Sequence, residues 1–578
     1  MLLRPLHCHR RVSNALKFTH LWSACRQSQV RRYASPASSS PDAQAASSRE
    51  RSTFYVTTPI FYPNAAPHIG HLYTLVTADI IARHARLAEP DRPVFFLTGT
   101  DEHGLKIQRA AETRGMDPLS FCNEISETFR ELARVANISY SRFIRTTDED
   151  HRKAVQRLWR DLDNKGFIWK DVYKGYYSVT DECFYTREQV ELRDGRYYAL
   201  ETGSVTELSE EENYMFSMSK LGERLGSFYL SEGHDSVVPD SHAFDVTTEV
   251  HLGLGDLSVS RPRSRLEWGI PVPDDCDHTI YVWVDALTNY LTATGYPWTE
   301  TGKEDLARFW PPDVQVVGKD IVRFHAIYFP AMLKALGIQG AKKILVHPHW
   351  TVDRKKMSKS VGNVVDPFAV IHELGVDVVR FYLARVGGSY SSDHGTYWSD
   401  VQLQKHSGEL RSLLGNLYSR THSTAVMRRL EDYRGIREVT LDAISVDGPT
   451  CPWTFEVMNG LESLGSQVGE DLSDFKIKDA LDRIVHQLNL VNRMLENVRP
   501  WDAATTTGDR AKAIALSSEA LRICGVVLQP FIPGKAAELL DGLGVPADER
   551  EWRHSGWLAG SVGEYVSSMV LFPKVQKK

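Results

Sequence analysis

Residues 53–87 read TFYVTTPIFYPNAAPHIGHLYTLVTADIIARHARL, and this stretch decides the fold. Residues 53–60 are mostly β-branched or aromatic and are followed by a proline-rich turn, which is typical of a buried strand. From residue 69 to about residue 87 the apolar side chains recur every three or four positions, which predicts a helix. A second apolar strand is expected at residues 93–98. Strand, helix and strand form a βαβ unit, which builds a parallel sheet.

Two loops leave the carboxyl ends of these strands, where parallel sheets bind their ligands. The first loop contains His68-Ile69-Gly70-His71. Its histidines lie three residues apart at a helix N-terminus, so both can face one ligand, and such a terminus attracts phosphate. Gly70 has no side chain and lets a base or a phosphate approach the backbone. The alternative interpretation of this tetrapeptide alone is a pair of solvated histidines.

The second loop brings a carboxylate, Asp101, to the same edge of the sheet. A carboxylate there can pair with an α-ammonium group, although it could also cap the next helix. Tyr62, Trp283 and His325 lie in three further segments that we expect at the sheet edge. Aromatic walls suit a polarisable thioether, and the alternative for each of these three residues is ordinary core packing.

A basic motif, Lys356-Met357-Ser358-Lys359-Ser360, lies far downstream in the loop after an expected strand at residues 343–346. Two ammonium groups and two hydroxyls on one loop can clamp a triphosphate and stabilise the charge that develops during phosphoryl chemistry. The alternative is an exposed basic loop. Residues 217–220 (SMSK) repeat part of the pattern, and we assign them no role.

The pattern along the chain predicts an α/β protein with a Rossmann-like parallel-sheet catalytic domain, an inserted connective domain and an all-α C-terminal domain. The insertion is indicated by short alternating segments, and the parallel-sheet pattern resumes at residues 280–284 and 314–317. The expected boundaries are 53–171 and 268–400 for the two halves of the catalytic domain, 172–267 for the insertion and 401–578 for the helical domain.

The N-terminus differs from the rest of the chain. Its first 41 residues contain seven basic side chains and no Asp or Glu. This Arg-rich, Ser-rich composition predicts a mitochondrial transit peptide over residues 1–33, a linker over residues 34–52 and a location in the mitochondrial matrix. The alternative is a disordered basic tail.

Composition argues against several classes of protein. A chain of 578 residues is too long for one core and suggests three or four domains. No stretch approaches 18 uninterrupted apolar residues, so we expect no membrane span. Without residues 1–33 the formal net charge falls from −6 to about −13, which does not suit a general nucleic-acid binder. The seven scattered cysteines form no CxxC pair, which argues against a disulfide framework and a zinc knuckle.

Taken in order, the motifs resemble those of the class I aminoacyl-tRNA synthetases, specifically the methionyl-tRNA synthetases of the mitochondrial or bacterial kind. The resemblance runs from about Thr53 to the C-terminal helices. The matching segments are residues 57–64 (TTPIFYPN), 68–71 (HIGH), 98–104 (TGTDEHG), 213–216 (NYMF), 281–286 (YVWVDA), 318–321 (GKDI), 324–325 (FH) and 356–360 (KMSKS).

This resemblance implies a two-step reaction that uses ATP with Mg²⁺, methionine and tRNA(Met), and no covalent enzyme intermediate. The residues implied to bind ATP and to stabilise the adenylation transition state are His68, Gly70, His71, Lys356 and Lys359. Those implied to bind methionine are Asp101, for the amine, and Ile60, Tyr62, Trp283 and His325, for the side chain.

The resemblance also implies that the helical domain reads the anticodon. Asn416 and Arg420, within GNLYSR (415–420), would contact anticodon bases, and Trp501, within RPW (499–501), would stack on a base. The alternative for Trp501 is a helix-end anchor in the core. Many relatives hold zinc in the insertion, but only Cys183 falls at a comparable place here, so we expect no zinc. The chain ends soon after its helices, so we expect a monomer.

Other functions fit less well. Synthetases for Val, Ile and Leu usually carry a long editing insertion, for which the span between the motifs is too short, and the cysteine enzyme needs zinc ligands that are missing. A non-catalytic RNA-binding descendant would be expected to lose one of His68, His71, Lys356 and Lys359, and all four are present. A small-molecule nucleotidylyltransferase would share only the ATP half.

Overall fold

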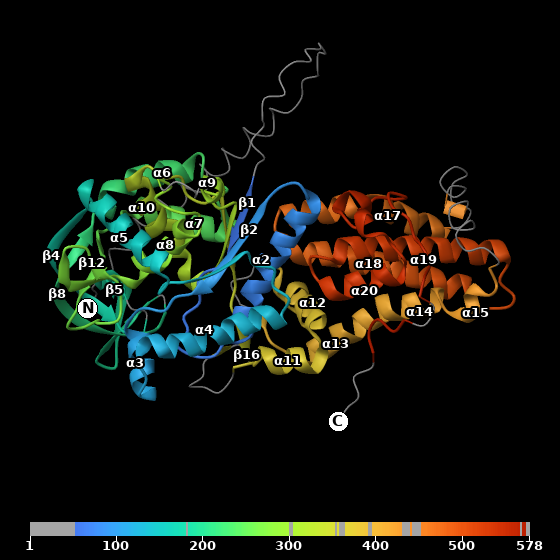
Figure 1. Ribbon diagram of the computed structural model, residues 1–578, viewed down its shortest axis with the longest axis horizontal. Helices are drawn as coiled ribbons and strands as arrows, with labels where there is room; N and C mark the ends of the chain where they lie inside the picture. Colours follow the sequence, from blue (N-terminus) through green and yellow to red (C-terminus); the bar gives the residue numbers. More distant parts are fainter. Residues whose placement is uncertain are drawn as a thin grey trace, which may run out of the picture. The chain divides into compact units, whose positions relative to one another are not determined.

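The loops with the predicted site residues leave a six-stranded sheet of order β3-β2-β1-β14-β15-β9, in which every neighbouring pair is parallel. The strands are β1 (Phe54–Thr57), β2 (Val94–Thr100), β3 (Arg142–Arg145), β9 (Val237–Val238), β14 (Val314–Gly318) and β15 (Lys343–His347). Strands β1 and β2 lie side by side (Figure 1). The chain moves outward from β1 through β2 to β3, and β14 pairs with the other side of β1. Ligands of such sheets bind where the strand order reverses.

The computed structural model describes residues 53–180, 183–200, 202–299, 304–352, 355–357, 364–390, 396–430, 440–441, 452–566 and 569–573. They all belong to the unit Ser52–Lys578. The predicted transit peptide and linker lie outside the described residues.

Both faces of the parallel sheet are buried under helices. Val56 and Phe96 belong to the core shared with α2 and α4, whereas their neighbours Tyr55 and Leu97 belong to the core shared with α5, α8 and α10. This alternation follows from the two-residue period of a strand. The helices are α2 (Ile69–Ala88), α4 (Pro118–Val135), α5 (Glu149–Asn164), α8 (Val282–Thr292) and α10 (Phe329–Leu336).

The stretch expected to be an insertion contains an antiparallel sheet of order β5-β4-β8-β7-β6. Its centre is the long pair β4 (Ile168–Ser178) and β8 (Val205–Phe216). The strands agree with the pattern read from the sequence, but two helices and β9 of the parallel sheet also fall in this stretch. The remaining elements here are β5 (Cys183–Tyr185), β6 (Val190–Arg193), β7 (Arg196–Ala199), α6 (Gly222–Leu230), α7 (Asp240–Leu252), β10 (Leu257–Ser258) and β11 (Ser260–Pro262). Two further strands, β12 (Pro271–Val272) and β13 (Asp275–Ile280), follow the insertion and pair with each other, and β13 also pairs with β11.

The prediction of a parallel strand at residues 280–284 is wrong. Strand β13 ends at Ile280 in a small antiparallel sheet, Tyr281 is the N-cap residue, and helix α8 begins at Val282. The apolar run spans this strand–helix junction, and a short apolar run has no period that distinguishes a strand from a helix.

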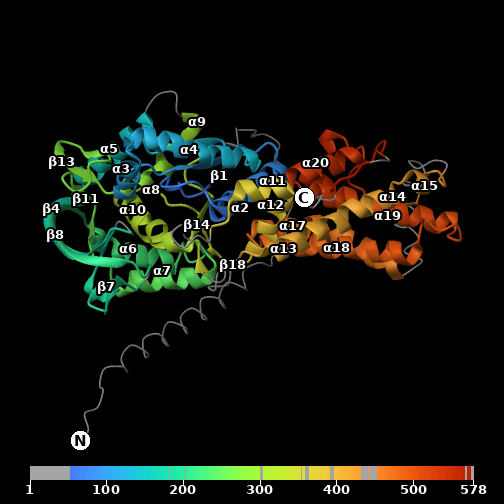
Figure 2. The ribbon, with the colours of Figure 1, turned by 90° about the horizontal axis from the view of Figure 1, so that it is seen from below.

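From Asp400 to Gly542 the described chain is mainly helical, as predicted. The apolar stripe expected from residue 477 to residue 495 is the buried face of α18, and α17, α18 and α19 pack against one another (Figure 2). None of the helices among the described residues combines the length and the apolar character needed to cross a membrane. The elements are α13 (Asp400–Leu410), η6 (Arg411–Asn416), α14 (Leu417–Thr421), α15 (Thr424–Met427), α17 (Pro452–Ser473), α18 (Ile477–Val498), α19 (Thr507–Leu528) and α20 (Pro533–Gly542).

A buried arginine joins α2 to the helical region. Arg380, on α12 (Val376–Gly387), donates to the Asp79 carboxylate on α2 at 2.7 Å. It also donates to the carbonyls of Pro530 and Phe531, both at 3.0 Å, in the turn between α19 and α20. Burial opposes charge on Asp79, but Arg380 and Arg83 hold the pKa of this carboxyl below its usual value. The helix that carries His71 is therefore fixed to the α19–α20 turn.

Candidate active site

Helix α2 begins with two histidines that cap its own backbone. The His68 Nδ1 accepts the N–H of Gly70 at 3.0 Å, and the His71 Nδ1 accepts the N–H of His68 at 3.0 Å. Their rings stack with centroids 3.8 Å apart. A neutral imidazole whose Nδ1 accepts a hydrogen bond carries its proton on Nε2. The Nδ1 of each ring accepts one backbone hydrogen bond, and the Nε2 of each ring therefore carries an N–H donor.

Gly70 leaves room for the ring of His68 where that ring caps α2. A Cβ atom at position 70 would lie 2.9 Å from Cε1 of that ring, inside van der Waals contact. The sequence interpretation gave Gly70 the role of leaving room for a ligand. In the structure, the absent side chain also leaves room for the cap.

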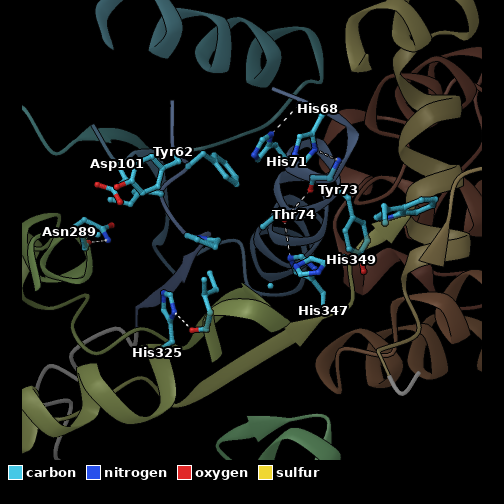
Figure 3. Close-up of a pocket in the computed structure, with 18 of the residues that line it drawn as sticks. Tyr62, His68, His71, Tyr73, Thr74, Asp101, Asn289, His325, His347 and His349 are labelled. Atoms are coloured by element: carbon cyan, nitrogen blue, oxygen red, sulfur yellow. Dashed lines mark hydrogen bonds between the residues drawn. The ribbon is translucent and has the colours of Figure 1, made fainter. Parts of the chain in front are cut away.

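One cavity of about 370 Å³ gathers the described residues that were predicted to bind ATP and methionine (Figure 3). They come from the loop after β1, the start of α2, the loop after β2, α8 and the turn before α10. Those that line the cavity are Ile60, Tyr62, His68, Gly70, His71, Asp101, Trp283 and His325.

Asp101 is held at the end of β2 by pairing between two loops. Its N–H donates to the carbonyl of Phe61 at 2.9 Å, and the N–H of Phe61 donates to the carbonyl of Gly99 at 2.9 Å. The next helix, α3 (Leu105–Arg114), has Gly104 as its N-cap residue, so Asp101 does not occupy the N-cap position. Asp101 is 4% exposed and lines the cavity.

One face of α8 forms an apolar wall of the cavity. Trp283, Ala286, Leu287 and Tyr290 all line it, at the spacing of one helix face. The Trp283 ring stacks on Phe324 with centroids 3.7 Å apart and planes 12° apart. The sequence interpretation missed the other three because it placed a strand here. Their helical spacing is the signal that could have found them.

His325 lies in a π-helical turn, Phe324–Tyr328, and not at a sheet edge as expected. Its Nδ1 donates to the carbonyl of Ile321 at 2.9 Å, and its Nε2 accepts the hydroxyl of Tyr290 at 2.8 Å. Burial lowers the pKa of His325 to about 4, so the imidazole is neutral at pH 7. A π-turn is frequent at functional sites.

Two histidines that the sequence interpretation missed, His347 and His349, also line the cavity. His347 ends β15; its Nδ1 donates to the carbonyl of Pro348 at 3.0 Å, and its Nε2 accepts the Thr74 hydroxyl at 2.9 Å. Burial lowers the pKa of His347 to about 4. The signal that could have found both is a His-Pro-His run directly after a predicted parallel strand.

We expect the buried histidines to make the protein less stable in acid. Burial lowers the pKa of His325, His347 and His422 from 6.5 to about 4. Between these values the unfolded chain binds protons that the folded protein does not, so each histidine reduces the free energy of unfolding by about 1.4 kcal/mol per pH unit as the pH falls. Melting temperatures measured from pH 7 to pH 4.5 check this, and His422→Leu should make their decline shallower. An unchanged decline in that variant would contradict it.

The basic motif starts beside the cavity. Lys356 belongs to β17 (Lys355–Lys356), which pairs antiparallel with β16 (Trp350–Val352), and Met357 lines the cavity. The side chain of Lys356 and the whole of Lys359 lie outside the described residues. Their roles in ATP binding stay predictions.

The similar run at residues 217–220 has a place in the core. Met218 and Leu221, in a 3₁₀ turn, are 3% and 1% exposed. Apolar packing therefore accounts for the two apolar side chains of this turn.

Two of the predicted anticodon residues meet at the surface of the helical region. The Arg420 guanidinium lies 5.7 Å from the ring centroid of Trp501, and it donates to the side chain of Asn492, which the sequence interpretation missed. Trp501 is 38% exposed, so it is not a core anchor. Asn416 is exposed and ends a second π-helical turn, Arg411–Asn416. An exposed ring beside a planar cation suits base stacking.

The Rossmann-like sheet, the capped histidine pair at its carboxyl edge and the helical region together define the class of protein. The family model described as "tRNA synthetases class I (M)" matches residues 54–194 and 198–422. The chain belongs to this family.

Similar proteins carry a more specific name. The chain is 42% identical over 515 residues to the "Probable methionine--tRNA ligase, mitochondrial" of Neurospora crassa, which covers 87% of this chain and 81% of the relative. It is 38% identical to the human "Methionine--tRNA ligase, mitochondrial", over 86% of this chain and 84% of the relative. The fold is also similar to the crystal structure of Mycobacterium tuberculosis methionyl-tRNA synthetase bound by methionyl-adenylate, with a TM-score of 0.78. The two sequences are 35% identical, and the match covers 90% of this chain and 100% of that chain.

Proposed function

We propose that this chain is a methionine–tRNA ligase, which joins methionine to ATP as methionyl-adenylate and then transfers the methionyl group to the 3′ end of tRNA(Met). The observation that carries the proposal is that three features line one and the same cavity. They are the capped N-terminus of α2, which suits phosphate, the carboxylate of Asp101 and the aromatic wall of α8.

In the first step, a carboxylate oxygen of methionine attacks the α-phosphorus of ATP, and pyrophosphate leaves. The N–H groups on Nε2 of His68 and His71 donate to phosphate oxygens as negative charge shifts toward the leaving group. Lys356 and Lys359 add positive charge from the motif loop. Asp101 accepts hydrogen bonds from the α-ammonium group, while Trp283 and the neutral His325–Tyr290 pair enclose the thioether. Catalysis is positioning and charge stabilisation.

In the second step, the terminal 2′-hydroxyl of tRNA attacks the carbonyl carbon of the adenylate, and AMP leaves. The protein forms no covalent bond to methionine in either step. Arg420, Trp501 and Asn416 contact anticodon bases in the helical region, which selects the tRNA.

Mg²⁺ bound to ATP would neutralise part of the charge on its phosphates. Across the described ranges, no three His, Cys, Asp or Glu side chains gather to hold a metal. Mg²⁺ that neutralises nucleotide phosphates needs few protein ligands, so the phosphates of ATP would hold most of its coordination. The prediction of no zinc rests on the lone Cys183, whose side chain lies outside the described residues.

We also propose that the protein works in the mitochondrial matrix as a monomer. The location is supported by the mitochondrial names of the relatives and by the acid-free, Arg-rich N-terminus. Import of the full-length chain into isolated mitochondria, with loss of about 33 residues, would support it, and a chain that stays outside would count against it.

Amino-acid-dependent ATP–pyrophosphate exchange, measured with each of the twenty amino acids and no tRNA, tests the activity. The proposal predicts exchange with methionine alone. Exchange with a different amino acid would refute the specificity. A folded protein that binds tRNA but exchanges with none of them would instead be a non-catalytic RNA-binding descendant.

We expect Trp501→Ala to weaken tRNA charging without slowing adenylation. Loss of a stacking platform costs about 1–3 kcal/mol per base, which is roughly a 5- to 150-fold loss in kcat/KM for tRNA. The rate of pyrophosphate exchange and the melting temperature check that the cavity and the fold are intact. Trp453→Ala is a matched control, because Trp453 is another exposed tryptophan beside an arginine, at 37% exposure. Equal losses in charging and exchange would make Trp501 a structural residue.

A further inference from the structure

Two residues of the matching motifs have no role in the reaction described above. His103 follows Asp101 by two positions, and Asp285 follows Trp283 by two positions. The described lining of the cavity includes neither of them. Asp285 has a side chain that is 1% exposed, yet it accepts hydrogen bonds from two imidazoles. His103 Nδ1 lies 2.7 Å from one of its oxygens, and His151 Nε2 lies 2.8 Å from the other. We call these three residues the Asp285 cluster.

The Asp285 cluster joins two walls of the cavity. Asp285 lies in the first turn of α8, whose opposite face carries Trp283 and Tyr290. His103 lies in the loop that holds Asp101. The backbone carbonyl of His103 also accepts the hydroxyl of Tyr62 at 3.0 Å, so a third lining residue depends on its position.

His151, on α5, lies outside the cavity and contacts α8 at two positions. Its Nε2 reaches Asp285 in the first turn of α8, and its Nδ1 lies 3.0 Å from Oγ1 of Thr292, the last residue of that helix. Residues 285 and 292 are seven apart and share one face. One fully buried imidazole therefore contacts both ends of α8 on the face that does not line the cavity.

The Asp285 carboxyl is ionised at neutral pH. Burial opposes charge on Asp285, but attraction to His103 and the hydrogen bonds from both imidazoles hold the pKa of this carboxyl below its usual value. Hydrogen bonds to a buried anion are short, strong and directional. A bridge of this kind therefore sets the distance and the direction between the groups that it joins.

We propose that Asp285 is a positioning residue for methionine, which uses His103 and His151 to set the distance between the Asp101 loop and the aromatic face of α8. The loop holds the group that pairs with the α-ammonium, and α8 holds the wall for the thioether, so this distance is the length that the amino acid must match. The inference rests on the proposed function, because it concerns the same site.

Asp285→Asn tests the bridge with almost no change in shape. A carboxamide presents one oxygen and one N–H₂ group, so it can accept from one imidazole only and points a donor at the other. We expect the KM for methionine in pyrophosphate exchange to rise ~10-fold or more, because misplacement by about 1 Å is costly, and the KM for ATP to stay within about 2-fold. Calorimetric titration with methionine alone should show the same loss in affinity.

His151 supplies a matched pair of variants that leave every cavity residue in place. The amide nitrogen of glutamine can replace Nε2–H of histidine as a donor to Asp285, whereas leucine fills a similar volume with no donor. His151→Leu should raise the methionine KM as Asp285→Asn does, and His151→Gln should restore most of the wild-type value. His422→Leu is the control, since His422 is equally buried and hydrogen-bonded to hydroxyls but lies in the helical region. It should lower the melting temperature and leave the methionine KM unchanged.

The outcomes separate this inference from the proposed function. Wild-type protein that fails to exchange with methionine refutes the function itself. If the wild type exchanges, an unchanged methionine KM in Asp285→Asn overturns the positioning role. If Asp285→Asn does not fold, the His151 pair decides: equal KM values for methionine in the Leu and Gln variants, or a parallel rise in the KM for ATP, also overturn it.

Discussion

His71→Asn is expected to slow methionine-dependent pyrophosphate exchange by ~10²–10³-fold, the usual loss when one donor to a developing negative charge is removed. The asparagine oxygen can occupy the place of Nδ1 and keep the bond to the N–H of His68, so the helix cap survives. What disappears is the N–H at Nε2. The KM for methionine should change little, because Asp101 and α8 are untouched.

The complementary variant separates the cap from the chemistry. In His71→Gln the side-chain amide can reach the place of Nε2 and restore a donor, but it loses the oxygen at the place of Nδ1. We expect a lower melting temperature and an exchange rate well above that of His71→Asn. Measured rates in the reverse order would mean that His71 acts only by capping α2.

Asp101→Asn should reduce kcat/KM for methionine by ~10²- to 5 × 10³-fold, because removing one partner of a buried ion pair costs about 3–5 kcal/mol. The carboxylate that pairs with the α-ammonium becomes a neutral amide of the same shape. A methionine analogue without the amino group gives a second measurement. Wild-type protein should bind methionine far better than this analogue, and the variant should bind the two almost equally.

A surface aspartate provides the control for this substitution. Asp117 is the N-cap residue of α4 and accepts the N–H of Ser120 at 3.0 Å. Asparagine is an equally good N-cap, so Asp117→Asn should leave exchange and stability unchanged. If Asp101→Asn kept the wild-type preference for the amino group, another residue would bind the amine.

The sequence was sufficient where one short segment determines its own structure. The strand at residues 54–57, the helix from residue 69 and the second strand were predictable, because their periods are strong and a proline-rich turn separates them. These elements place His68, His71 and Asp101 at one edge of the sheet, so most of the predicted site followed from local pattern and the rule for parallel sheets.

The rest depended on contacts that no local pattern reveals. Tyr290 lines the cavity because α8 begins at residue 282, and the strand–helix junction was hidden inside an apolar run. The π-helical turn that presents His325 has one extra residue per turn, which sequence periodicity does not signal. His151 is 134 residues from Asp285, so only the packing of α5 against α8 shows that they touch.

The capping of α2 by its own histidines also bears on how long a reactive product can survive in the cavity. A mixed anhydride such as an aminoacyl adenylate is hydrolysed quickly when a nearby lone pair can accept a proton from water. In His68 and His71 that lone pair is on Nδ1 and is already bonded to a backbone N–H. The pair can donate to phosphate but cannot act as a base toward water. The first turn of α2 can therefore bind the phosphate of the anhydride without promoting its hydrolysis before the tRNA binds.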